Sequence, residues 1–228
     1  MPIVRAVFLD GYGTLIHAPR AFERAVELAR QLDCHASTDL IHAALQQEML
    51  HYRDHCHEAW NAESLQRLLE DCADLFLAAI ADDDAPLPIT RSQAVELLLD
   101  SFRFELFGEV ISSLTSLRSL PVKLGVISNF DYRLPQLLAD LEAREYFDFV
   151  LTSADFEPKP ARTMFDQALR IVGTPPVQVI HVGDEVESDV EPARACGIRP
   201  VLLARNGATA PGDVVMIRSL SELPALVA

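Results

Sequence analysis

Residues 7–15 read VFLDGYGTL, and this stretch decides the fold of the chain. Residues 3–9 form an apolar run, interrupted by one arginine, that ends abruptly in the carboxylate of Asp10. A short apolar run bounded by turn residues is typical of a buried strand in a parallel sheet. In open parallel sheets, ligands bind beyond the carboxyl ends of the strands. The pattern therefore predicts Asp10 at this edge, where a nucleophile or a metal ligand is needed.

From about residue 105 onward, apolar strand-like runs alternate with helical patterns. The expected strands cover residues 122–127, 147–151, 177–182, 200–203 and 214–217. The expected helices between them cover residues 109–119, 134–141, 161–172 and 187–195. Strands that alternate with helices predict an α/β fold, here a Rossmann-like, doubly wound parallel sheet.

Residues 17–104 have helical spacing of apolar residues and no strand alternation. Thr90 and Gln93 form a capping-box pattern at the start of one of the expected helices. Ser37 or Thr38 is expected to cap another. The Asp- and Pro-rich residues 82–88 are expected to end the helix before them. The sequence therefore predicts a core domain of residues 1–16 and 105–228, with an inserted α-helical cap of residues 17–104 over the active edge.

The charge of the chain limits its partners. It has 34 acidic and 19 basic residues, which gives a formal net charge of −15. This charge disfavours nucleic acid and anionic membranes, so we expect a small-molecule substrate and a monomer or homodimer. No apolar run approaches the roughly 18 residues of a membrane span, and the first residues lack a signal-peptide pattern. We therefore expect a cytoplasmic protein, whose four cysteines are reduced thiols because they show no CxxC spacing.

Polar side chains follow the expected strands of the core in turn. They are Asp10 with Thr14, Ser128 with Asn129, Lys159, and Asp184 with Asp189. Because the carboxyl ends of parallel strands share one edge of a sheet, we expect these groups to lie close together.

These groups suit phosphoryl chemistry as a set. Mg²⁺ takes oxygen ligands and bridges carboxylates to phosphate, and Asp10, Asp184 and a main-chain carbonyl near Tyr12 would supply such oxygens. The ammonium of Lys159 and the hydroxyl of Ser128 would hold the phosphoryl oxygens. The loop after Asp10 adds backbone N–H donors.

The motifs resemble those of the haloacid dehalogenase superfamily. The matching segments are residues 10–14 (DGYGT), Ser128-Asn129, Lys159 and residues 183–189 (GDEVESD). The resemblance covers nearly the whole chain and implies that the helical insert is a cap of the C1 type. Residues 128–134 and 146–153 are similar to one branch, the haloacid-dehalogenase-like hydrolase domain-containing protein three group.

The resemblance implies a role for each matched position. Asp10 is the nucleophile that forms an aspartyl intermediate, and Lys159 stabilises charge. The residues expected to bind the transferring group are Gly11, Tyr12, Thr14, Ser128, Asn129 and Lys159. The residues expected at the Mg²⁺ site are Asp10, Tyr12, Asp184 and, behind them, Asp189. The implied activity is that of a Mg²⁺-dependent phosphatase acting on a small phosphorylated metabolite.

Tyr12 departs from the pattern of the family's phosphatases, which usually carry an aspartate there as general acid and base. A tyrosine with a pKa near 10 is a poor base at neutral pH, although it can donate a proton. The superfamily's haloacid dehalogenases do carry Tyr here, because a halide leaves without a proton. Against dehalogenation, the chain keeps Asp184 and Asp189 and has no clear match to the dehalogenases' cap arginine. Slow phosphatase, dehalogenase and binding protein without turnover all remain open, and we favour the first.

A second metal site is conceivable within the helical insert. His51 and His55 lie one helical turn apart, with Cys56 beside the second, and this spacing can bind Zn²⁺. A fourth ligand is missing from the pattern, so we favour an ordinary polar helix face.

Overall fold

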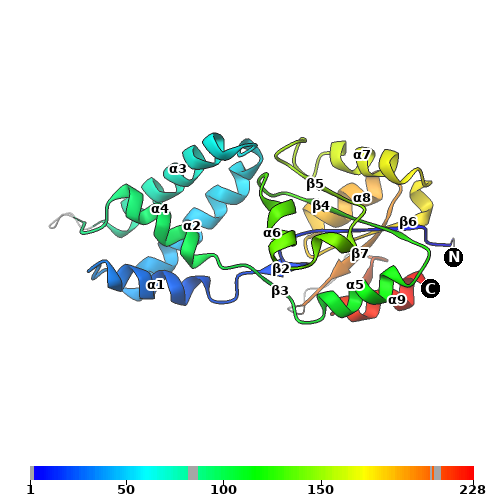
Figure 1. Cartoon of the computed structure of the whole chain (residues 1–228), viewed down its shortest axis with the longest axis horizontal. Coiled ribbons are helices and arrows are strands. Elements are labelled where there is room, and N and C mark those ends of the chain that lie inside the picture. Colours follow the sequence, from blue (N-terminus) through cyan, green and yellow to red (C-terminus); the bar gives the residue numbers. More distant parts are fainter. Residues whose placement is uncertain (1–2, 82–86, 206, 208–211) are drawn as a thin grey trace. The chain divides into compact units, whose positions relative to one another are not determined.

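The computed structural model describes residues 3–81, 87–205, 207 and 212–228. The chain divides into two compact units, Met1–His17 with Leu106–Ala228, and Ala18–Glu105. Figure 1 colours both units along the sequence. Most of the helix break expected at residues 82–88 lies outside the described residues.

The first unit is built on a six-stranded sheet in the order β5-β4-β1-β6-β7-β8. These strands are β5 (Phe149–Thr152), β4 (Lys123–Ser128), β1 (Ala6–Leu9), β6 (Val179–Gly183), β7 (Arg199–Leu203) and β8 (Val215–Ile217). All neighbouring strands pair in parallel. The sheet confirms the expected Rossmann-like α/β fold, and each of the six strands coincides with an apolar run of the sequence.

Helices cover both faces of this sheet (Figure 1). They are α5 (Val110–Arg118), α6 (Leu134–Asp140), α7 (Thr163–Val172), α8 (Glu191–Ala195) and α9 (Leu223–Val227). Phe8 of β1 packs in one core with Phe165 of α7 and Ala193 of α8. All four residues of β1 are buried, as expected for a strand covered on both sides.

The strand order directs the site to β1. The chain passes from β1 to β4 on one side, and later returns to β6 on the other side of β1. In open α/β sheets, ligands bind outside the carboxyl ends of the strands at such a switch point. The ends of β1, β4 and β6 therefore form the expected site edge.

The helix expected at residues 187–195 begins differently. A π-helix, Val186–Val190, precedes the short α8. Pro192 has no N–H to donate, so a regular helical ladder cannot run through it. The π-helical segment carries Asp189, one of the expected site residues.

Two very short strands were not expected. β2 (Ile16–His17) and β3 (Glu105–Leu106) form a two-stranded sheet of their own. They lie where the chain passes between the two units. Two residues are too few to produce an alternating pattern in a sequence.

The second unit consists of helices packed around their own core. The helices are α1 (Ala21–Gln31), α2 (Thr38–His55), α3 (Ala62–Ile80) and α4 (Arg91–Ser101), with a 3-10 turn at Cys56–Glu58. Thr90 and Gln93 form the expected capping box of α4, and Ser37 caps α2. Within the described part of the chain, no helix is long and apolar enough to cross a membrane.

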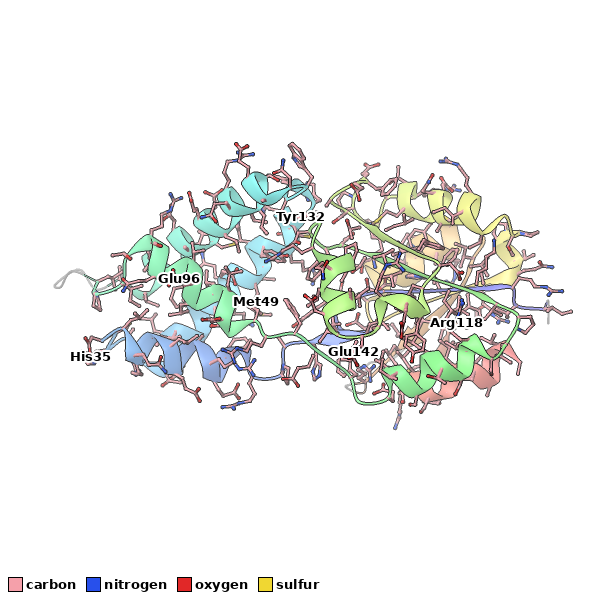
Figure 2. All side chains as sticks on the ribbon, in the orientation of Figure 1. His35, Met49, Glu96, Arg118, Tyr132 and Glu142 are labelled. Carbon is pink, nitrogen blue, oxygen red and sulfur yellow. The ribbon has the colours of Figure 1, made fainter. Side chains whose placement is uncertain are left out.

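The core of the helical unit contains a buried acid. Glu48 of α2 is 3% exposed, and its Oε2 has no hydrogen-bond partner within the described residues. Burial raises the pKa of Glu48 to about 7, although the thiol of Cys72 on α3 opposes the shift. Burial, together with the charge of Glu48, raises the pKa of the Cys72 thiol. By contrast, Glu96 of α4 is exposed (Figure 2).

We expect Glu48 to make stability depend on pH. Its pKa is about 7 in the folded chain against an ordinary 4.5, so the folded state binds the proton more tightly. The contribution of Glu48 to stability is therefore greatest below about pH 4.5 and falls as the pH rises towards 7, by up to about 3 kcal/mol. Glu48→Gln should remove this fall in urea unfolding series between pH 4.5 and 8. Glu96→Gln is the control, and a wild-type profile in Glu48→Gln would contradict the assignment.

Candidate active site

The ammonium of Lys159 lies between two buried carboxylates. Its Nζ is 2.6 Å from Oδ1 of Asp10 and 2.5 Å from Oδ1 of Asp189. All three residues are buried. Burial alone would lower the pKa of Lys159, but the two carboxylates raise it, so the ammonium remains charged. Burial raises the pKa of Asp10, an effect that Lys159 opposes.

Asn129 fixes the loop that carries Lys159. Its Nδ2 donates to the carbonyl of Lys159 at 2.8 Å, and the N–H of Lys159 donates to its Oδ1 at 2.8 Å. The sequence suggested that Asn129 contacts the substrate. In the structure its amide pairs with the main chain of Lys159, and this pairing orients Lys159 towards Asp10, while the contact with substrate stays a prediction.

Ser128 and the loop after Asp10 lie close together. Ser128 ends β4 and is buried, and a Cβ on Gly11 would lie 2.7 Å from its Oγ. Thr14 is fully buried, and its Oγ1 has no hydrogen-bond partner within the described residues. A buried hydroxyl without a partner is costly, so the loop after Asp10 carries an unused donor.

Asp184 follows β6 directly and completes an acidic cluster. Oxygens of Asp10, Asp184 and Asp189 lie within 4.8 Å of one another. Burial and the charges of Asp10, Asp189 and Glu185 raise the pKa of Asp184 to about 7. Three carboxylates face one ammonium here, so the cluster has an excess of negative charge and a set of hard oxygen donors. Both properties fit Mg²⁺.

Tyr12 lies in the same loop, where it forms a β-bridge with Ile16. Its side chain is 40% exposed. Burial and the charge of Asp184 raise the pKa of Tyr12 above its ordinary value of 10. The phenol therefore keeps its proton at neutral pH and can act as a donor but not as a base.

Two glycines allow the carboxylates to approach the main chain. Gly13 has a φ of +82°, and a Cβ there would lie 2.2 Å from Oδ2 of Asp184. A Cβ on Gly183 would lie 2.1 Å from Cγ of Asp189. Any larger residue at Gly13 or Gly183 would therefore collide with a carboxylate of the acidic cluster.

His181 is a site residue that sequence reasoning missed. Its Nε2 lies 3.0 Å from Oδ1 of Asp189, and its ring packs edge-on against Phe165. Burial alone would raise the pKa of Asp189, but Lys159 and His181 hold it below its usual range. The sequence signal that could have indicated it is a single polar residue, His181, inside the apolar run of β6.

His51 and His55 of the helical unit contact each other along α2. The rings of His51 and His55 stack at 4.2 Å, and Nδ1 of His55 lies 2.9 Å from the carbonyl of His51. Within the described residues, the metal-compatible cluster is that of Asp10, Asp184 and Asp189. The interpretation as a polar helix face stays a prediction.

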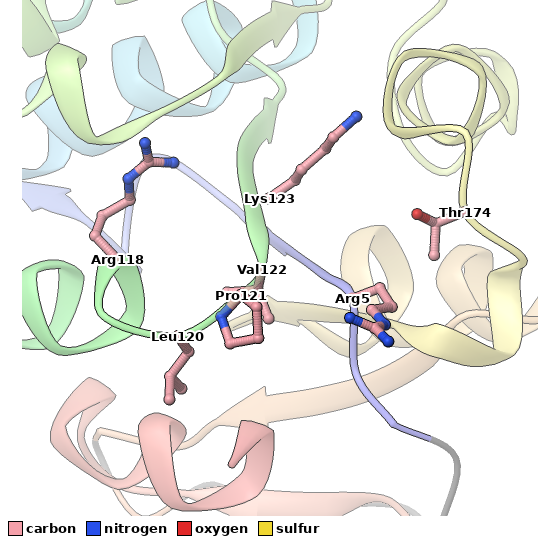
Figure 3. Close-up of a pocket in the computed structure, with 7 residues that line it drawn as sticks. All are labelled: Arg5, Arg118, Leu120, Pro121, Val122, Lys123 and Thr174. Atoms are coloured by element: carbon pink, nitrogen blue, oxygen red, sulfur yellow. The ribbon is translucent and has the colours of Figure 1, made fainter.

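A cavity of about 390 Å³ contains none of these site residues, and Figure 3 draws the side chains that line it. It is lined by Arg5, Arg118, Leu120, Pro121, Val122, Lys123 and Thr174. Lys123 begins β4, so the cavity lies at the amino ends of the strands. Nζ of Lys123 donates to the carbonyl of Val172 at 3.1 Å, and Arg118 pairs with Asp148 at 3.3 Å. The charged groups of Lys123 and Arg118 therefore already have partners within the chain.

Comparisons with known proteins show which family the sequence resembles. The sequence profile of the haloacid dehalogenase-like hydrolases matches residues 4–197. The chain is 39% identical to haloacid dehalogenase-like hydrolase domain-containing protein 3 of Danio rerio over 127 residues, which are 54% of this chain and 52% of that protein. The chain thus spans about half the length of these curated relatives.

Two further known proteins are similar to almost the whole chain. N-acylneuraminate-9-phosphatase of Homo sapiens is 26% identical, over 98% of this chain and 94% of that protein. The crystal structure of a dehalogenase with an intermediate complex superimposes with a TM-score of 0.73 at 20% identity, over 100% and 99% of the two chains. The second likeness supports the fold alone.

Gly13→Ala should destabilise the protein even without metal. A side chain at φ +82° costs about 1–2 kcal/mol, and the contact with Asp184 adds a similar amount. Urea unfolding in EDTA measures the loss. Gly173→Ala isolates the first effect, because φ is +62° and a Cβ there would meet nothing within 4 Å. Gly108→Ala, which also meets nothing, controls for both. Equal losses in Gly13→Ala and Gly173→Ala would contradict the close approach of Asp184.

Proposed function

Because the chain belongs to the haloacid dehalogenase-like hydrolases, we propose that it is a Mg²⁺-dependent phosphatase of a small phosphorylated metabolite. The observation that carries this proposal is the acidic cluster of Asp10, Asp184 and Asp189 around one ammonium. A nucleophilic carboxylate and an excess of hard oxygen donors are the combination that an anionic phosphate ester requires.

In the proposed reaction, Asp10 is the nucleophile. Lys159 binds its Oδ1, which leaves Oδ2 to attack phosphorus. The new Oδ2–P bond forms as the P–O bond to the alcohol breaks, and the alcohol leaves with a proton. Water then attacks the phosphorus of the aspartyl-phosphate, which releases phosphate and restores the Asp10 carboxylate.

The phosphoryl oxygens need donors, and the chain places several at this edge. Lys159 supplies its ammonium, while Ser128 and the unpartnered hydroxyl of Thr14 supply O–H groups. The backbone of Gly11 and Tyr12 adds N–H donors. Fixed donors of this kind stabilise developing charge without reorganising during the reaction.

The residues that would hold Mg²⁺ are Asp10 and Asp184, with the main-chain carbonyl of Tyr12 and with Asp189 behind them. When bound, the ion supplies positive charge that lets an anionic nucleophile approach an anionic phosphate. The oxygen-only donor set and its surplus negative charge support this choice.

Tyr12 is the proposed proton donor to the departing alcohol. After this transfer the phenolate regains a proton from solvent, because its pKa lies above 10, so Tyr12 is protonated again and is a poor base for activating water in the second step. General acid–base help contributes typically 10²–10⁴-fold, so we infer a slow phosphatase. The same residue favours the second candidate, a 2-haloacid dehalogenase, because a halide needs no proton. The carboxylate of Asp184, which gives the cluster its surplus negative charge, weighs against that candidate.

We also propose the remaining assignments of the sequence. Residues 17–104 act as the cap that selects the substrate, and the protein acts in the cytoplasm. The four cysteines are free and buried, which supports a reducing compartment.

Asp10→Asn should reduce hydrolysis of p-nitrophenyl phosphate at least about 10³-fold, because the amide is no nucleophile. The exposed Asp140 provides the control variant Asp140→Asn, which should retain wild-type rates. EDTA should also abolish turnover, and Mg²⁺ should restore it.

Full activity in Asp10→Asn, or activity that ignores EDTA, would rule out this phosphatase mechanism. Chloride release from 2-chloropropionate without metal would instead support dehalogenation. Absence of both reactions, with a stable partner in pull-down, would support a protein that binds without turnover.

Tyr12→Asp should raise kcat for p-nitrophenyl phosphate roughly 10-fold or more, because a carboxylate can act as acid and then as base. Tyr12→Phe is the matched control, since it keeps the ring and removes only the hydroxyl group. We expect Tyr12→Phe to be slower than wild type with substrates that have a basic leaving alcohol. A flat response in both variants would show that another residue serves as the acid.

A further inference from the structure

Arg205 lies just after β7, yet it binds the loop that follows the proposed nucleophile. Its Nη2 donates to the carbonyl of Thr14 at 2.9 Å, and its Nε donates to the carbonyl of Gly13 at 3.3 Å. These carbonyls belong to the two residues after Tyr12. The guanidinium therefore holds two successive peptide groups of the loop.

The guanidinium is itself fixed on two other sides. Its Nη1 donates to Oε1 of Glu109 at 2.5 Å, and its carbon lies 3.7 Å from the ring centroid of Phe107. Burial alone would raise the pKa of Glu109, but the bond from Arg205 lowers it, so the carboxylate stays charged. Arginine can stack its planar guanidinium on an aromatic face while its N–H groups donate hydrogen bonds in the plane of the guanidinium. Lysine cannot do both.

Phe107, on which the guanidinium stacks, lies close to where the chain passes from one unit to the other. The ring of Phe107 stacks on that of His17, with centroids 4.0 Å apart and 13° between the planes. The N–H of Phe107 donates to the carbonyl of Leu15 at 3.1 Å. His17 ends one segment of the first unit, and Leu106 begins the next. Arg205 thus ties the nucleophile loop to the segment that returns from the helical unit.

The loop that Arg205 holds has little room to move. A Cβ on Gly13 would lie 2.2 Å from Oδ2 of Asp184, so this main chain packs directly on the acidic cluster. Tyr12 and Thr14 lie on either side of that contact. Displacement of about 1 Å in a positioned group can reduce a rate by about 10²-fold.

We propose that Arg205 is a positioning residue that fixes residues 11–16, so that Tyr12 and Thr14 keep their placement relative to Asp10. The catalytic part of this inference rests on the proposed phosphatase function. The structural part, the fixing of the loop, does not.

The test compares Arg205→Met and Arg205→Lys with wild type. The control is Arg194→Met, which removes an arginine that pairs with the exposed Asp213 at 3.0 Å, outside the cluster. Hydrogen–deuterium exchange followed by mass spectrometry measures protection of residues 11–16. Kinetics with p-nitrophenyl phosphate and Mg²⁺ measure kcat and KM separately.

In Arg205→Met, we expect exchange in residues 11–16 to be at least about 10-fold faster and kcat to fall roughly 10- to 100-fold, with KM within about 3-fold. Arg205→Lys keeps the positive charge but loses the several N–H donors of the guanidinium. Its exchange rate and kcat should therefore lie between those of Arg205→Met and wild type. Arg194→Met should match wild type in both measurements.

Wild-type exchange of residues 11–16 in Arg205→Met overturns the proposal, and so does a kcat equal to that of Arg194→Met. If the wild type hydrolyses no p-nitrophenyl phosphate, the proposed function fails while the exchange result still decides the role of Arg205. If Arg205→Met does not fold, Arg205→Lys and Glu109→Gln provide the same comparison. Glu109→Gln weakens the anchor of the guanidinium and should also speed exchange of the loop.

Discussion

One ammonium group, that of Lys159, determines how the candidate site is arranged. Removing an ion from water costs several kcal/mol unless close partners replace the lost hydration. Asp10 and Asp189 provide these partners, at 2.6 and 2.5 Å. Each carboxylate would be just as costly to bury without Lys159. Asp10, Lys159 and Asp189 therefore form one unit, and within the described residues Asp184 is the carboxylate of the cluster without an ion pair.

The fold was largely predictable because its signals are local. The six strands of the core are apolar runs that end in turn residues, and the Thr90–Gln93 capping box lies within four residues. The features that were missed have no local signal of that kind. β2 and β3 contain two residues each, and the π-helix at Val186–Val190 differs from an α-helix in hydrogen bonding and not in composition.

The sequence predicted that the candidate site residues lie close together, but not which contacts they make. Asp10, Lys159, Asp184 and Asp189 come together as the motif order indicated. The pairing of Asn129 with the main chain of Lys159 spans 30 residues, and the bond from Arg205 to Thr14 spans 191. Such contacts depend on how loops from different strands meet, which spacing in one sequence does not encode.

The pairing of β2 with β3 also bears on how the core is assembled. β1 must pair with β4 across the inserted residues 18–105, a long-range contact that would slow folding. The helical unit has its own core, and its two connections to the rest of the chain meet in the β2–β3 pair. Once these helices have formed, the insert acts as a short cross-link rather than a long loop, so less closure entropy is lost when β1 meets β4. The insert thereby shortens the effective path between two strands that it separates in sequence.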